Sequence, residues 1–333
     1  MTGTVDLRRL FIVGCPRSGS TWATHLLAQH PHVAAFQHAK FFEYLFHVRK
    51  WHHNKARFSY LLRRDPDADP TARDEKDPRK KNLESVLSEK QLFQLLRQFA
   101  SEILEHVASF VPEAELVVDK TPENGRFGEF IHRMFPDAYF LHIVRDPRST
   151  FCSMRSASRS WAQWEFPTRP VDGGRFWVEE VLASRQIGRR TDRYLELRYE
   201  DLREDGPGQL ARVFEWAGLK HDLALCEEAI DACTKDRMRD HRTLPKDFVR
   251  KVPQGGWRDE LSSREVRILD YLTRDLMAEL GYAPAREVRG KPLGVLLQDL
   301  IEAPLAFLDR RGRRLLQLAH WGIRGRKLEW PEP

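Results

Sequence analysis

The chain has few cysteines and no long apolar run, and both absences narrow what it can be. Only four of the 333 residues are cysteine, and none stands in a Cys-x-x-Cys pair. This excludes a disulfide framework and the usual zinc spacing, and it predicts a protein of a reducing compartment, the cytoplasm. No stretch of about 18 apolar residues occurs, so we expect no membrane-spanning helix. The apolar run near the N-terminus is too short for a signal peptide.

Strong compositional bias is also absent, which excludes a disordered or fibrous chain. Apolar residues make up 41% of the sequence and charged residues 31%, as in a globular protein with a sizeable core. The formal net charge of +6 favours anionic ligands, although a plain solvated surface explains it more simply. Residues 63–85 are charged and rich in proline, and we interpret them as a lid or a solvated insertion.

Short apolar runs alternate along the chain with segments of helical spacing. We expect strands at 10–14, 33–36, 116–119, 139–144 and 194–199, and helices at 22–29, 41–62, 88–109, up to 134, from 147, 173–192, 207–217, 223–232 and 262–280. This alternation predicts an α/β fold for residues 1–290, a three-layer P-loop-type parallel β-sheet flanked by helices. Residues 291–333 are expected to form a helical extension packed on that domain or on a partner. Ligands of such sheets bind at the carboxyl ends of the strands.

The first candidate site is the segment CPRSGST, residues 15–21, between the first strand and the first helix. Gly14 and Gly19 permit tight turning, and successive backbone N–H groups at a helix N-terminus bind anions. Arg17 adds a positive charge, and hydroxyl donors follow at Ser18, Ser20 and Thr21. The pattern indicates a phosphate-binding loop, with a purely structural turn as the alternative.

This loop lacks the lysine of a Walker A motif, G-x-x-x-x-G-K-[ST], because Ser20 follows Gly19. That lysine contacts the β- and γ-phosphates of ATP, and the next hydroxyl holds magnesium. The absence argues against a P-loop nucleotide-dependent kinase or phosphotransferase, which remains the alternative function.

The segment PRSGSTW resembles the 5′-phosphosulfate-binding loop of 3′-phosphoadenylyl sulfate (PAPS)-dependent sulfotransferases of the bacterial and Golgi-like type, commonly P-[KR]-S-G-T-T-W. Only Ser20 departs from it, and serine keeps the hydroxyl. The resemblance implies a sulfotransferase with PAPS as donor and PAP as product. The 5′-phosphosulfate would be held by Arg17, Ser18, Gly19, Ser20 and Thr21, with Trp22 near the adenine.

Two further segments resemble motifs of the same family. In IVRDPRSTFCS, residues 143–153, Arg145 precedes Ser153 by eight positions, which is the spacing of the family's 3′-phosphate motif. A strand-end arginine and a serine about two turns into the next helix are able to reach one phosphate, although an Arg–Asp ion pair and an ordinary helix serine would also explain them. The segment RYEDL resembles the family's Y-E-D-[LM], which implies that Tyr199 lies near the adenine; a structural tyrosine is the alternative.

A fourth segment, RKVPQGGWR at 250–258, is similar to the loop R-K-G-x-x-G-D-W-K that closes over the 3′-phosphate in the family. Val252 and Gly256 depart from that pattern, so the basic residues carry more weight than the loop shape. The matching residues are Arg250, Lys251, Gly255, Trp257 and Arg258.

Sulfuryl transfer resembles phosphoryl transfer, so in-line positioning and positive charge should dominate catalysis. The phosphate leaving group of PAPS is already activated, so we expect no metal requirement. Arg17 and Lys120, in DKTP, are the candidate charges, and a pair between Lys120 and Asp119 is the alternative reading of that lysine. The resemblance places His38 where the family carries its general base, with Glu43 as the rival.

The acceptor remains open in the sequence: a hydroxyl or amine of a sugar, phenol, secondary metabolite or lipid. Residues 292–321 show apolar residues near helical spacing beside the basic cluster 310–314. We favour a core or homodimer interface for this segment, with peripheral membrane contact as the alternative. Since no nucleic-acid-binding motif is present, we expect no nucleic-acid partner.

Overall fold

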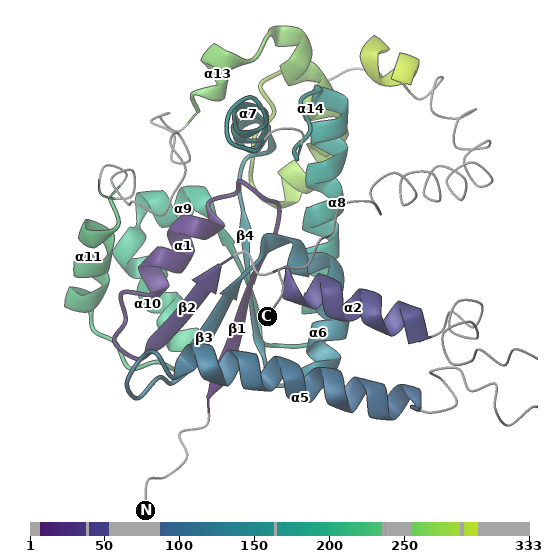
Figure 1. Cartoon of the computed structure of the whole chain (residues 1–333). Helices are drawn as coiled ribbons and strands as arrows, with labels where there is room; N and C mark the ends of the chain where they lie inside the picture. Colours follow the sequence, from purple (N-terminus) through teal and green to yellow (C-terminus); the bar gives the residue numbers. More distant parts are fainter. Residues whose placement is uncertain are drawn as a thin grey trace, which may run out of the picture.

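A computed structural model describes residues 7–37, 40–52, 87–162, 165–234, 237, 255–286 and 290–298. Among these residues, five parallel strands form one sheet in the order β2-β3-β1-β4-β5 (Figure 1). The strands are β1 Arg8–Val13, β2 Val33–Gln37, β3 Leu116–Lys120, β4 Tyr139–Val144 and β5 Tyr194–Arg198. Each coincides with an apolar run expected to form a strand, and the prediction of an α/β fold with a parallel sheet is confirmed.

Both faces of the sheet are buried at its centre, which explains why β1 and β4 are mainly apolar rather than alternating with polar residues. In β1, Leu10 and Ile12 point into one core cluster, whereas Phe11 and Val13 point into the other. All four side chains are fully buried. β1 therefore forms the centre of the domain, and whatever follows it emerges at the middle of the sheet.

Helices cover the two faces and the carboxyl end of the sheet (Figure 1). One face carries α1 Ser20–Leu27, α9 Tyr199–Glu204, α10 Gly206–Trp216 and α11 Leu223–Ala232. The other face carries α2 Phe41–His52, α5 Glu89–Ala108, the 3₁₀ turn η1 Pro122–Phe127, α6 Gly128–Met134 and part of α8 Pro170–Gly188. Beyond the strand ends, α7 Pro147–Ser158, α13 Trp257–Glu260 and α14 Ser263–Glu279 pack with α8 in a third cluster.

The structure differs from the expected elements after β5, because the last expected strand residue, Tyr199, begins the short helix α9. Arg198 is extended, and the Arg198 guanidinium lies 3.6 Å from the Asp201 carboxylate in the first turn of α9. This helix turns the chain sharply at the carboxyl end of β5, next to the end of β4.

Several expected segments lie outside the described residues, namely the charged segment 63–85, the helix beyond residue 52 and most of the extension 291–333. Within the described part of the chain, no helix combines the length and the apolar character needed to cross a bilayer. The four cysteines are buried and free.

Candidate active site

The loop between β1 and α1 has an unusual backbone. Gly14 and Gly19 have φ angles of 133° and 100°, and Arg17 also lies in the left-handed region at 72°. A Cβ at Gly14 would lie 2.6 Å from the carbonyl oxygen of Ile143, and one at Gly19 would overlap the ring of Tyr199. Glycine is therefore required at both positions. Left-handed residues before a helix turn successive N–H groups toward one side, which suits an anion.

Two motifs that are far apart in the sequence touch at this loop. Arg17 Nε donates a hydrogen bond to Ser153 Oγ at 3.3 Å, and Arg145 Nη1 donates to the carbonyl oxygen of Arg17 at 3.4 Å. Arg145 follows β4, which pairs directly with β1, and Ser153 lies on α7. The predicted 5′- and 3′-phosphate motifs therefore share one end of the sheet.

Aromatic side chains lie next to Arg145 at the same end of the sheet. The Arg145 guanidinium lies 4.5 Å from the centre of the Tyr199 ring, and Tyr199 meets Trp22 edge to face at 5.7 Å. Trp22 Nε1 donates to the carbonyl oxygen of Cys233 at 2.9 Å, which fixes the indole on α1. Tyr199 thus contacts both of the other residues that the sequence associates with the 3′-phosphate and the adenine, Arg145 and Trp22.

The loop and the residue after β4 contain buried polar atoms that an anionic ligand would satisfy. Ser18 is fully buried, and Ser18 Oγ has no hydrogen-bond partner among the described residues. Within the same ranges, Arg145 Nε is also buried without a partner. Buried donors without acceptors are costly, and a bound phosphate or sulfuryl oxygen would remove that cost. The residues present therefore fit a nucleotide that carries anionic groups at both ends.

Lys120 ends β3 and is fully buried. Burial lowers the pKa of Lys120 to about 7; the Glu123 carboxylate opposes this shift, and the nearby Arg17 guanidinium adds to it. The neighbouring Asp119 accepts hydrogen bonds from Thr121 Oγ1 at 2.8 Å and Asn124 Nδ2 at 3.0 Å. Because adjacent strand residues point to opposite faces, Lys120 and Asp119 face different sides of the sheet. Lys120 thus lies close enough to Arg17 of the loop for their charges to interact.

A family model described as the sulfotransferase family matches residues 9–222, more than half of the chain. The chain belongs to this family. The match covers the loop, Lys120 and the Arg145–Ser153 motif, and it extends past α9.

Individual relatives of this sulfotransferase are distant. The nodulation protein NoeE of Sinorhizobium fredii is 25% identical over 82% of this chain and 65% of its own length. The protein-tyrosine sulfotransferase of Drosophila melanogaster is 27% identical over 45% of this chain and 26% of its own. The omega-hydroxy-beta-dihydromenaquinone-9 sulfotransferase Stf3 of Mycobacterium tuberculosis is 30% identical over 31% of this chain and 29% of its own length. The chain therefore spans less than two thirds of the length of these relatives.

Solved sulfotransferase structures resemble the chain more widely but weakly. The sulfotransferase domain of the Synechococcus PCC 7002 olefin synthase has a TM-score of 0.49 and 18% identity over 83% of this chain and 95% of its own. Mouse sulfotransferase SULT7A1, solved with PAP, has a TM-score of 0.48 and 13% identity over 82% and 86%. The family assignment rests on the family model rather than on these two structures.

The two candidate bases of the sulfotransferase follow β2. His38 lies outside the described residues, one position after Gln37, which pairs in register with Lys120. Glu43, on α2, lies 3.9 Å from the imidazole of His47 one turn further along the helix. The described part of β2 therefore ends at Gln37 beside Lys120, whereas Glu43 lies near His47 on its own helix.

The fourth motif of the sulfotransferase is described only in part. Arg250 and Lys251 lie outside the described residues. Gly255 has a φ angle of 79°, and Trp257 is buried against α7 with the Arg148 guanidinium 4.1 Å from the indole. Trp257 thus anchors the end of this segment beside the helix that carries Ser153.

Sequence reasoning missed several side chains that support the site. Trp161 lies 5.1 Å from the Arg17 guanidinium, and Trp177 and Glu200 bond to the backbone around Arg145. Glu200 belongs to the RYEDL motif and is adjacent to Tyr199, which was a usable signal. Trp161 and Trp177 carried no signal, because only the folding of α7 and α8 brings them to the strand ends.

Two other features concern metal binding and a second cavity. Within the described ranges, no group of three or more His, Cys, Asp or Glu side chains is arranged to bind a metal ion. A pocket of about 400 Å³ lies between η1, α6 and α8, lined among others by Arg126, His132 and Arg190. None of the predicted donor-binding residues lines this pocket, so it is separate from the loop.

Proposed function

We propose that this sulfotransferase moves a sulfuryl group from PAPS to a hydroxyl or amine of an acceptor. The single observation that carries the proposal is the contact between the two anion-binding motifs. Arg17 bonds to Ser153, and Arg145 bonds to the backbone of Arg17, so the two motifs lie close enough to bind one ligand. A nucleotide with phosphate groups on its 5′ and 3′ positions matches two adjacent anion sites beside aromatic rings.

In this proposal the donor lies across the carboxyl ends of β1 and β4. The N–H groups of the loop and its hydroxyls hold the 5′-phosphosulfate, and Arg145 with Ser153 holds the 3′-phosphate. Tyr199 and Trp22 flank the adenine. The segment 250–257 closes over the 3′-phosphate with Arg250, Lys251, Gly255 and Trp257. The loop residues involved are Arg17, Ser18, Gly19, Ser20 and Thr21.

The reaction is a group transfer in which the acceptor oxygen or nitrogen forms a bond to sulfur while the bond between sulfur and the phosphate oxygen breaks. PAPS supplies the activated sulfuryl group, and its phosphate leaves as part of PAP. His38 takes the acceptor proton, with Glu43 as the rival base. Arg17 and Lys120 place positive charge where negative charge develops on the leaving oxygen.

The acceptor is best described as a hydroxyl compound. Two of the partial relatives are named for an omega-hydroxy menaquinone and for protein tyrosine, both of which offer a hydroxyl. We therefore infer a hydroxyl acceptor for this chain ahead of an amine.

The competing function, a P-loop kinase or phosphotransferase, needs ATP and magnesium. Ser20, the first residue of α1, stands where that mechanism requires lysine. The family assignment also favours sulfuryl over phosphoryl transfer.

The test is thermal unfolding with PAP, PAPS or ATP and magnesium, followed by an acceptor screen with labelled PAPS. Saturating PAP should raise the melting temperature, because a ligand that binds only the folded chain stabilises it by about 2.7 kcal/mol at 100 times its Kd. ATP with magnesium should stabilise the chain much less. Stabilisation by ATP and magnesium without an effect of PAP would reject the proposal.

We also propose that residues 1–290 form the catalytic domain, with the extension 291–333 packed on it or on a partner. The described start of the extension, residues 291–298, supports packing on the domain. Val295 is buried with Val171 and Ile268, and Gln298 Nε2 donates to Asp172 at 2.6 Å.

A further inference from the structure

The peptide group between Arg145 and Asp146 is held on both of its polar atoms. The carbonyl oxygen of Arg145 accepts a hydrogen bond from Trp177 Nε1 at 3.0 Å. The N–H of Asp146 donates to Glu200 Oε1 at 3.1 Å. Trp177 is fully buried on α8, and Glu200 is 7% exposed on α9. Two helices from distant parts of the chain therefore fix the backbone at the root of the Arg145 side chain.

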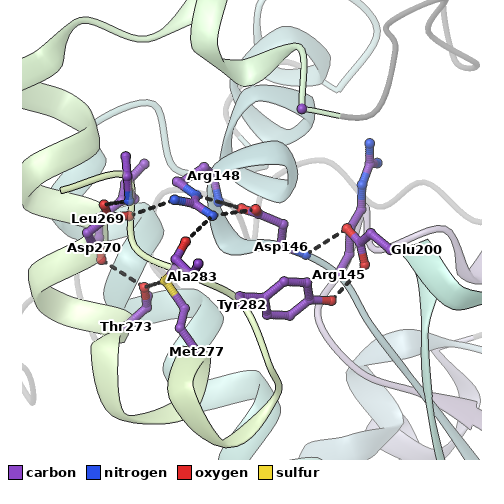
Figure 2. Close-up of polar contacts among 12 residues, drawn as sticks. Arg145, Asp146, Arg148, Glu200, Leu269, Asp270, Thr273, Met277, Tyr282 and Ala283 are labelled. Atoms are coloured by element: carbon purple, nitrogen blue, oxygen red, sulfur yellow. Dashed lines mark hydrogen bonds and ion pairs between the residues drawn. The ribbon is translucent and has the colours of Figure 1, made fainter.

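Glu200 is itself oriented by a second buried group. Tyr282, just after α14, donates its hydroxyl to Glu200 Oε2 at 2.7 Å (Figure 2). The Arg198 guanidinium lies 4.5 Å from the centre of the Tyr282 ring and so packs against the side chain that orients Glu200. Burial raises the pKa of Glu200, whereas the bonds from Tyr282 and Asp146 and the charge of Arg145 oppose this shift. Both carboxylate oxygens thus have defined donors, and the orientation of Glu200 is determined.

A second set of contacts holds the following residues. The Asp146 carboxylate accepts from the backbone N–H of Arg148 at 2.8 Å and caps α7. The Arg148 guanidinium bonds both oxygens of Asp146, and it reaches Asp270 on α14 at 3.3 Å and the carbonyl oxygen of Ala283 at 3.1 Å (Figure 2). The segment after α14 therefore supports the strand end twice, through Tyr282 and through Ala283.

The helix start that carries Glu200 also carries Tyr199, whose ring lies against the Arg145 guanidinium. Neighbouring residues of α9 thus contact the backbone and the side chain of the same arginine. A bidentate contact between an arginine and a phosphate depends strongly on the direction of the guanidinium. Small displacements of the Arg145 peptide would be magnified at the far end of this long side chain.

We propose that Glu200, oriented by Tyr282, is a positioning residue for the 3′-phosphate subsite: it fixes the Arg145–Asp146 peptide and thereby the direction in which Arg145 meets the phosphate. The inference rests on the proposed function, because it takes Arg145 as the partner of a 3′-phosphate. It predicts that loss of Glu200 weakens recognition of that phosphate while the rest of the nucleotide still binds.

The experiment compares calorimetric affinities of the full chain for PAP and for AMP, which lacks the 3′-phosphate. We expect Glu200→Ala to lower the ratio of PAP to AMP affinity at least tenfold while AMP affinity changes less than threefold. Glu200→Gln keeps an acceptor oxygen for the N–H of Asp146 and should stay within threefold of the wild-type ratio. Tyr282→Phe should lower the PAP-to-AMP affinity ratio as Glu200→Ala does, but by a smaller factor. If Glu200→Ala does not fold, Tyr282→Phe takes its place in the test.

Glu196→Ala is the matched control. Glu196 is a partly buried carboxylate on β5 that binds Arg185 and His142 instead of the Arg145 peptide. It should lower the melting temperature and leave the PAP-to-AMP ratio unchanged. If Glu200 acts through Arg145, the double variant with Arg145→Ala should lose no more of the ratio than Arg145→Ala alone.

The positioning role would be overturned by an unchanged PAP-to-AMP affinity ratio in Glu200→Ala and Tyr282→Phe, or by additive losses in the double variant. In either case a wild-type chain that prefers PAP to AMP would still support the proposed function. A wild-type chain that binds PAP no better than AMP would overturn the proposed function and the positioning role with it.

Discussion

Replacing Lys120 with methionine should remove most of the pH dependence of PAP binding. The side chain is fully buried at the end of β3, and burial lowers its pKa from 10.5 to about 7. The free chain therefore holds this ammonium charged in only about half of the molecules at pH 7. Methionine has a similar length and an apolar stem, so the substitution removes the charge with little change in packing.

The magnitude follows from proton linkage. An anionic group beside Lys120 stabilises the ammonium and raises its pKa again, so PAP binding takes up a proton. The charged fraction of the free chain falls from about one half at pH 7 to about one tenth at pH 8. PAP affinity should therefore fall about fivefold over that interval and about tenfold, or ~1.4 kcal/mol, for the next pH unit.

Calorimetry in two buffers of different ionisation enthalpy tests this directly. At pH 7 the wild-type chain should take up about half a proton per PAP bound, and Lys120→Met should take up almost none. Phosphate groups, with a second pKa of about 6, are largely ionised above pH 7, so the change in affinity between pH 7 and pH 9 reports the protein. A flat wild-type profile without proton uptake would refute the reasoning, and an unaltered slope in Lys120→Met would assign the proton to another group.

Three further predictions concern the loop, the base and the metal. Gly19→Ala should lower the free energy of unfolding by about 1–3 kcal/mol, because Gly19 has a φ of 100° and an added Cβ would overlap the Tyr199 ring. Gly290→Ala is the control and should lower it less, because Gly290 has a φ of 73° but open space around it. Equal losses of stability in thermal melts would contradict the close contact at Gly19. His38→Ala should lower kcat about 100-fold or more at unchanged PAP affinity, with Glu43→Gln near wild type; the reverse result would make Glu43 the base. Excess EDTA should leave the transfer rate unchanged, because the phosphate leaving group is already activated, and a loss restored by magnesium would favour the phosphotransferase.

The secondary structure was largely readable because the signals are local. Strands such as β4, YFLHIV, are short apolar runs bounded by turn residues, and the expected range 139–144 matches the observed one. The helix α9 escaped prediction because it has only six residues, and the alternation of YLELRY suggested a strand continuing to Tyr199. A segment that short is decided by its surroundings rather than by intrinsic propensity.

The candidate site likewise has parts that could be predicted from local sequence and parts that could not. The glycines of residues 14–21 predict the tight turns of the loop because the conformation of a tight turn depends on the residues within it. The supports of Arg145 could not be read, since Trp177 and Tyr282 are 32 and 137 positions away from it in the chain. Their roles depend on which helix packs over which strand end.

The sequence by itself determined the parallel α/β fold and the tight glycine turns of the loop, since apolar periodicity and glycine placement act over a few residues. Only the tertiary structure decided that β1 lies between β3 and β4, which brings Lys120, Arg17 and Arg145 to one place. Burial in the folded chain, together with the nearby Arg17 charge, lowers the pKa of Lys120, and the packing of α8, α9 and α14 holds the Arg145–Asp146 peptide. These properties arise from the environment that distant segments create, and that environment exists only once the chain has folded.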